Sequence, residues 1–223
     1  MKILSYLFFF LCLFSVSSFA QTQKHSAQET EQKPSDLIKL AAFLPSDCFH
    51  AGQFQQAKKI KGMSAPLITL GAYIFDCQQG LIWQTNDPIV ESIIYPIANI
   101  PLMIKAGDKI EVLDGKVHKT LGKILNNLIG GDTSFIDKNF SIASNDSGFL
   151  LTPKSRRLRK FIRNISMLQN ESAVTITIAH SDEESTQIQL FGKRTLQKID
   201  SSRCATLALA PISACAALYK QVL

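Results

Sequence analysis

The sequence predicts a mainly β domain (α+β) of roughly nine to eleven antiparallel strands, with a few helices packed against the sheet. Short segments in which apolar and polar residues alternate follow one another along most of the chain, as in strands with one buried face. Polar turn sequences at 145–148 and 182–184 join neighbouring segments in the manner of hairpins. The predicted strands are residues 49–59, 67–77, 80–85, 89–95, 100–105, 109–113, 135–143, 148–152, 160–168, 173–180 and 186–192.

Residues 1–20 predict a cleavable signal peptide. Lys2 precedes an apolar run that is too short to cross a bilayer, and Ser18 and Ala20 are the small residues that a signal peptidase recognises. Residues 21–35 contain no large apolar side chain and therefore predict a disordered leader. The remaining residues, 36–223, are expected to form one exported domain with a C-terminal tail.

The four cysteines after the signal peptide predict two disulfides, because export leads to an oxidising compartment. If 49–59 and 67–77 form a hairpin centred on Gly62-Met63, Cys48 lies opposite Cys77. Cys204 then pairs with Cys215 and tethers the tail, a loop closure worth about 3 kcal/mol. The alternative is a zinc site, although neither pair has the C-x-x-C spacing of a closed tetrahedral site.

Two segments have clear helical spacing. The first begins at Ser35-Asp36, which can cap it, and stops at Pro45. The second has apolar residues from Leu121 to Ile129 on one face, ends at Gly130-Gly131, and must pack on an apolar surface. Residues 156–165 also fit helical spacing, but we predict a loop followed by a strand there, and a small helix at 213–219 in the tail.

The basic character of the chain is concentrated in one segment. The formal charge is +6 and the pI about 9.1. Such a cluster can contact an anionic membrane surface or an acidic partner, or can be an ordinary solvated surface. Nucleic acid is not expected, because no exposed aromatic residues are interleaved with the cations. The cluster consists of Lys154, Arg156, Arg157, Arg159, Lys160 and Arg163.

Several short motifs occur in a characteristic order. C-F-H-A-G-Q-F-Q-Q at 48–56 is followed by G-A-Y-I-F at 71–75, G-L-I-W-Q-T-N-D-P at 80–88 and, after the amphipathic helix, F-L-L-T-P-K at 149–154. Over about residues 36–193 the chain resembles the periplasmic outer-membrane lipoprotein carrier LolA family, as a divergent branch. The resemblance implies an open, incompletely closed antiparallel β-barrel with helices forming a lid over an apolar concave face. It implies a monomer with no cofactor, no metal and no reaction.

The resemblance also implies a function. The cargo would be an acylated lipoprotein or another lipid, received from an inner-membrane transporter and passed to an outer-membrane acceptor by this periplasmic carrier or chaperone. One departure from the family is that Cys77 stands where the carrier has an arginine that helps to hold the lid shut. The alternatives are a lipid-sensing regulatory module and a hydrolase acting on a hydrophobic substrate.

Independently of the family, a curved sheet with one apolar face and a narrow helical stripe over it leaves an interior that side chains need not fill. An ordinary core position is the alternative for each residue that we expect in its lining. His50, His118 and His180 belong to no catalytic motif, so we do not expect an enzyme. The expected lining residues are Phe54, Tyr73, Phe75, Trp83, Leu125, Leu128, Phe140, Ile142, Ile176 and Ile178.

Overall fold

A computed structural model describes residues 34–170, 173–180, 184–207 and 209–220. The predicted signal peptide and nearly all of the predicted leader lie outside these residues.

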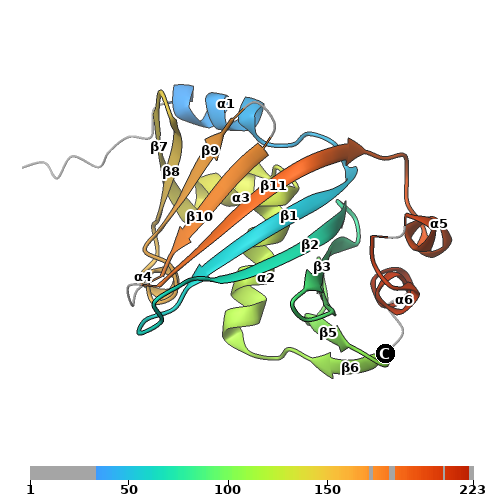
Figure 1. Cartoon of the computed structure of the whole chain (residues 1–223). Coiled ribbons are helices and arrows are strands. Elements are labelled where there is room, and N and C mark those ends of the chain that lie inside the picture. The colour runs from blue at the N-terminus through green and yellow to red at the C-terminus, as the bar shows by residue number, and fades with distance from the viewer. Residues whose placement is uncertain (1–33, 171–172, 181–183, 208, 221–223) are drawn as a thin grey trace, which may run out of the picture. The chain divides into compact units, whose positions relative to one another are not determined.

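One eleven-stranded antiparallel sheet organises the described chain, in the order β6-β5-β4-β3-β2-β1-β11-β10-β9-β8-β7. No described strand pairs with the outer side of β6 or β7, so the sheet stays open, as predicted. Figure 1 shows it bending around α2. The strands are β1 (Phe49–Lys59), β2 (Leu67–Asp76), β3 (Gly80–Asp87), β4 (Glu91–Pro96), β5 (Leu102–Lys105), β6 (Lys109–Val112), β7 (Phe140–Asn145), β8 (Gly148–Pro153), β9 (Asn164–Gln169), β10 (Ala173–Ala179) and β11 (Ser185–Thr195).

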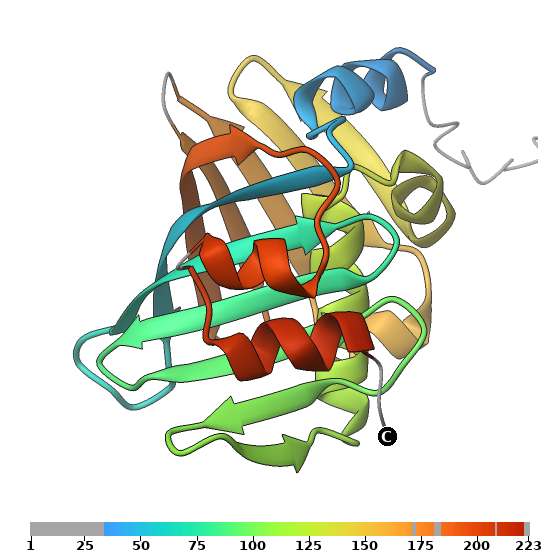
Figure 2. The ribbon, with the colours of Figure 1, turned by 90° about the vertical axis from the view of Figure 1, so that its right-hand side faces the viewer.

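Helices lie on both faces of the sheet (Figures 1 and 2). We call the face that carries α2 the inner face and the face that carries α5 and α6 the outer face. Among the described residues no helix is long and apolar enough to cross a membrane. The helices are α1 (Pro34–Phe43), α2 (Lys116–Ile129), α3 (Thr133–Asn139), α4 (Arg156–Arg159), α5 (Ser201–Thr206) and α6 (Ile212–Lys220).

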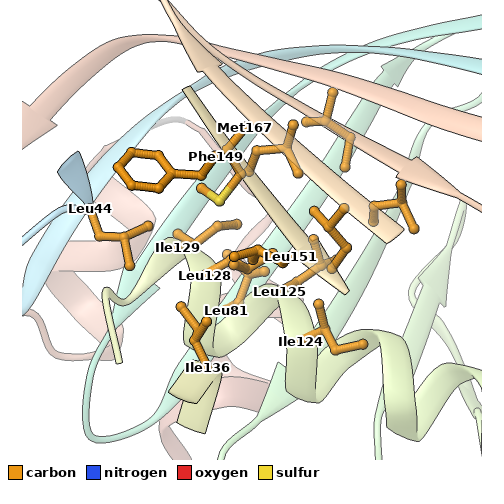
Figure 3. Packing of buried hydrophobic residues seen from close by; sticks show 14 of the residues in the cluster. Leu44, Leu81, Ile124, Leu125, Leu128, Ile129, Ile136, Phe149, Leu151 and Met167 are labelled. Carbon is orange, nitrogen blue, oxygen red and sulfur yellow. The ribbon is translucent and has the colours of Figure 1, made fainter. Parts of the chain in front are cut away.

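Each face has its own hydrophobic core. On the inner face, the apolar stripe of α2 packs against large side chains of the strands, together with α1 and α3 (Figure 3). On the outer face, α5 and α6 cover a row of smaller residues that the strand register places side by side: Ala51, Ile74, Ile82 and Ile94.

The structure confirms both predicted disulfides and the hairpin register on which the first depends. Phe49 pairs with Asp76, which places Cys48 opposite Cys77 with their Cα atoms 4.9 Å apart. The Cα atoms of Cys204 and Cys215 are 5.7 Å apart, and their bridge joins α5 to α6. All four thiols are therefore bonded and are not free to act as zinc ligands.

Two predicted strands begin later than expected, because short helices precede them. The prediction of strand at 135–143 is wrong up to Asn139: Asp132 accepts hydrogen bonds from the backbone N–H groups of Ser134 and Phe135, at 3.0 and 3.1 Å, and so starts α3. The segment 160–168 becomes strand only at Asn164, since α4 and the link after it come first. In the tail, α5 was not expected.

Candidate functional site

Large apolar side chains line the inner face beneath α2. Alternate residues of each strand point to this face, so Phe54 of β1, Tyr73 of β2 and Trp83 of β3 belong to the same buried cluster. From the opposite side, Leu125 and Leu128 of α2, which lie one turn apart, pack onto them. α2 therefore covers the inner face as the predicted lid.

The space beneath α2 contains two pockets. The first, which we call the hairpin pocket, has a volume of about 310 Å³ and reaches the arm of the β1–β2 hairpin at Leu67. The second, which we call the α1 pocket, has a volume of about 470 Å³ and reaches Phe43 and Leu44 at the end of α1. Both volumes lie within or near the range of small-molecule sites, roughly 300–1,000 Å³.

The two pockets are neighbours along the elements that line both of them. On β10, Ile178 lines the hairpin pocket and Ile176, the next inward residue, lines the α1 pocket. On α2, Leu125 lines the hairpin pocket and Leu128 lines the α1 pocket. On β11, Ile188 lines the hairpin pocket and Leu190 lines the α1 pocket. The pockets are thus two compartments of one apolar groove.

An aromatic pair lies in the buried cluster between the sheet and α2. The rings of Phe54 and Trp83 are stacked, with centroids 3.8 Å apart and planes inclined by 19°. Phe54 can lie flat because its partner on β2 is Gly71; a Cβ there would be 2.6 Å from the Phe54 ring and 1.9 Å from the backbone oxygen of Gln84. The Trp83 ring lines the hairpin pocket, and the Tyr73 ring, 6.4 Å from it between centroids, lines the α1 pocket.

The structure divides the ten expected lining residues into two groups. Trp83, Leu125 and Ile178 line the hairpin pocket. Tyr73, Leu128 and Ile176 line the α1 pocket. The other four lie in the buried inner core and line neither pocket: Phe54, Phe75, Phe140 and Ile142.

His50 ties the lid to the sheet, a role that the sequence did not suggest. It is fully buried on β1, and its Nε2 donates to the carbonyl of Ile129 at the end of α2, at 3.1 Å. Burial, with the charge of Lys193, lowers the pKa of His50 to about 4, so that the ring is neutral at ordinary pH. No local pattern signals this role, because the bond joins positions 79 residues apart in the sequence.

The α1 pocket has a polar rim. Lys193, which contributes to its lining, forms an ion pair with Asp47 at 2.5 Å, and this hydrogen bond holds the pKa of Asp47 below its ordinary value. Gln169 and Asn170 lie at the same pocket, whereas Val174, Ile176 and Leu190 are apolar. An amphiphile could therefore place its apolar part inside and its polar part at the rim.

Comparison with solved structures finds similar folds. A LolA superfamily protein from Nitrosomonas europaea has a TM-score of 0.43 and 9% identity, over 75% of this chain and 95% of that one. A DUF1329 family protein from Desulfovibrio piger has a TM-score of 0.46 and 9% identity, over 78% and 96%. A putative outer membrane lipoprotein-sorting protein domain from Vibrio parahaemolyticus has a TM-score of 0.43 and 5% identity, over 78% and 97%.

Two of these three structures are named for the LolA superfamily or for lipoprotein sorting. No protein-family model matches the chain, and a search of curated proteins finds no match.

The pockets contain no cluster typical of a metal centre. Among the residues that the structure describes, no group of three or more His, Cys, Asp or Glu side chains is placed to hold a metal ion. His118 and His180 both line the hairpin pocket. His180 has both ring nitrogens within 3.1 Å of a partner, the carbonyl of Phe161 and the hydroxyl of Thr186, which accounts for it as a structural side chain.

Proposed function

We propose that the protein is a periplasmic carrier that holds the acyl chains of a lipoprotein or a related lipid beneath α2 and moves this cargo from the inner to the outer membrane. The observation that carries the proposal is the pair of adjoining apolar pockets between the inner face and α2. Two disulfides are typical of a protein from an oxidising compartment such as the periplasm.

The walls of the pockets suit reversible binding of a hydrocarbon chain. Each methylene removed from water contributes about 0.8 kcal/mol, so a single acyl chain gains substantial affinity from apolar contact alone. The side chains that line the two pockets where they adjoin are apolar or aromatic. They include Trp83, Leu125 and Ile176. No strong polar contact is needed to hold such a cargo, so it can be released again to an acceptor.

The tail after β11 packs on the sheet that carries the proposed site. After β11, α5 and α6 pack on the outer face of the sheet and contribute Cys204, Cys215 and Leu218 to its core. The described residues of the tail are therefore part of the same domain. A donor transporter and an acceptor would supply direction to the transfer.

Trp83 provides a direct test, because it is the only tryptophan in the chain and lines the hairpin pocket. Titration with dibromostearate should quench its fluorescence, since bromine quenches on contact, whereas unbrominated stearate should compete and restore it. Filling the α1 pocket with Val174→Phe should weaken binding about tenfold, by removing contacts for roughly two methylenes. The matched control is Val112→Phe, at an exposed position of β6.

Lipids that co-purify with the protein from the periplasm identify the cargo by mass spectrometry. Intact lipid or lipoprotein supports the carrier, and a processed product would support the hydrolase instead. Absence of both quenching and bound lipid would overturn the proposal.

A further inference from the structure

The end of the molecule at the hairpin pocket is formed by five segments, which we call the mouth face: residues 58–67 of the β1–β2 hairpin, 88–90 between β3 and β4, 116–118 at the start of α2, 156–163, and 184–186 at the start of β11. Leu67, Ile89, His118 and Thr186 line the hairpin pocket together, which brings four of these segments to one opening.

Further contacts join residues 156–163 to the other segments of the mouth face. A third pocket of about 280 Å³ brings Val117 of α2 together with Lys160 and Phe161 and with Glu184. The backbone N–H of Lys61 donates to Glu184 at 3.4 Å, which joins the hairpin to the start of β11. The mouth face is therefore one continuous surface built from segments far apart in the sequence.

Large apolar side chains are exposed on three of the segments around this opening. The exposed fraction is 53% for Met63, 44% for Leu67, 65% for Ile89, 58% for Val90 and 54% for Val117. Three of the five segments contribute them. Ile89 and Val90 lie in the turn after β3, so they project at its end and pack on no core.

Cations surround these apolar side chains. Among the described residues, those that are acidic and lie on or beside the face are Asp87, Glu91 and Glu184, and the last accepts from the hairpin backbone. Asp182 and Glu183 precede Glu184 in the sequence, outside the described residues. The cations are exposed in the structure: Lys58, Lys59, Lys61, Lys116, Arg156, Arg157 and Lys160.

The basic segment of the sequence contributes unequally. Lys154 donates to the carbonyl of Asp137 at 2.6 Å, and Arg159 donates to the carbonyls of Pro153 and Lys154 at 3.1 and 2.7 Å. These two cations are turned back onto the protein. Arg156 and Arg157 are exposed, and none of the salt bridges among the described residues includes either of them.

The exposed apolar residues of β6 lack this setting. Ile110 and Val112 are each 51% exposed, but the neighbouring charges are mixed: Lys105 pairs with Glu111 at 2.6 Å. The described apolar side chains of the mouth face, by contrast, occur together with more cations than acidic residues. This combination is typical of a surface that rests in the head-group region of an anionic bilayer.

We propose that the mouth face docks on an anionic bilayer surface. Met63, Ile89 and Val90 would enter the boundary between head groups and acyl chains, while Arg156 and Arg157 meet lipid phosphates. Docking in this orientation places the opening of the hairpin pocket against the membrane. The proposal goes beyond the carrier function, because the surface would bind whether or not the pockets hold a lipid.

Vesicle co-sedimentation of the full mature chain tests it. Binding to phosphatidylglycerol–phosphatidylcholine vesicles should exceed binding to pure phosphatidylcholine vesicles and should fall with added salt. Arg156→Gln/Arg157→Gln should lower the affinity at least about tenfold, from the loss of two phosphate contacts. Ile89→Ser/Val90→Ser should lower it about tenfold by loss of apolar contact.

Two double variants serve as matched controls. Lys109→Gln/Lys198→Gln removes the same net charge away from the mouth face, and Ile110→Ser/Val112→Ser removes similar exposed apolar area on β6. Both should bind vesicles as the unmodified protein does, and thermal unfolding checks that every variant is folded. Equal losses in variants and controls would overturn the proposal, as would equal binding to the two vesicle types. Either result would favour an acidic protein as the partner of the mouth face. The carrier function is tested separately by quenching of Trp83, so failure of one proposal can be distinguished from failure of the other.

Discussion

The two faces of the sheet differ in the side chains that fill them. On the outer face the register aligns Ala51, Ile74, Ile82 and Ile94, and the fully buried residues of the helices above them are aliphatic or cysteine, with the rings of Phe49 and Tyr219 only partly buried at the edge. On the inner face, aromatic and long aliphatic side chains meet a single amphipathic helix, and two pockets remain. Small and branched residues allow close approach, whereas large rings hold the helix away from the sheet.

This difference shows how one sheet can have one face that stabilises the fold and another face that contains pockets for a ligand. The outer core is fastened by the bridge between Cys204 and Cys215, both of which are fully buried in it. The inner core is fastened at one end, where His50 binds the end of α2 beside the bridge between Cys48 and Cys77. Substitutions on the two faces should therefore separate stability from binding.

The largest effect is expected from Ile82→Ala in the outer core. Ile82 is fully buried, so truncation should lower the free energy of unfolding by roughly 3–4 kcal/mol through lost contact and the cavity left behind. Urea unfolding measures this change, and Ile110→Ala at an exposed position should change it by less than about 0.5 kcal/mol. Quenching of Trp83 by dibromostearate should be unchanged while the variant is folded; a large change would show that the faces are coupled.

Removing the outer bridge with Cys204→Ser/Cys215→Ser should lower the free energy of unfolding by about 3 kcal/mol, since the bridge closes a short loop. Chemical denaturation of the oxidised parent and the variant provides the measurement. A variant that keeps its stability but loses acyl binding would contradict the assignment of stability to the outer face and of binding to the inner face.

Acidification should weaken the inner face through His50. Its pKa is lowered from 6.5 to about 4 in the folded protein, so the unfolded chain takes up the proton first as the pH falls. The stability from this group is present above 6.5 and is lost as the pH falls toward about 4, with a loss of about 2 kcal/mol by about pH 5. In His50→Gln, which keeps a donor for the Ile129 carbonyl, the free energy of unfolding should lack this part of the pH dependence. An identical pH profile in parent and variant would contradict the assignment.

The smallest effect is expected at the wall of the α1 pocket. Val174 is half-buried beside space that is already open, so Val174→Ala should cost less than about 1 kcal/mol of unfolding free energy. A cost as large as that of Ile82→Ala, measured under the same conditions, would mean that the wall is ordinary core.

The sequence predicts the long elements well and the short ones poorly. The two arms of the β1–β2 hairpin and α2 show many periods of their pattern, and the cysteines fix the hairpin register. By contrast, α3, α4 and α5 have 7, 4 and 6 residues, too few for a period to be recognised. Their visible signals are the capping residues Asp132, Ser155 and Asp200, each of which accepts from a backbone N–H of its helix.

The candidate site could be predicted only in part, because all of its inward positions look alike in sequence. Phe140 and Trp83 are both aromatic and both occupy inward positions of strands, yet only Trp83 reaches a pocket. What separates them is tertiary packing: Trp83 stacks on the Phe54 ring, for which Gly71 leaves space, and it lines the hairpin pocket beside residues of α2. Neither depends on the local pattern, and the mouth face likewise requires the tertiary contacts among its five segments.

The connectivity of the two bridges has a consequence for biogenesis. The four bonded cysteines pair consecutively along the chain, at separations of 29 and 11 residues. If the chain is oxidised from its N-terminal end in an oxidising compartment, Cys48 and Cys77 become available before Cys204. Oxidation in that order would yield the native pairs directly, without reshuffling of a wrong pair.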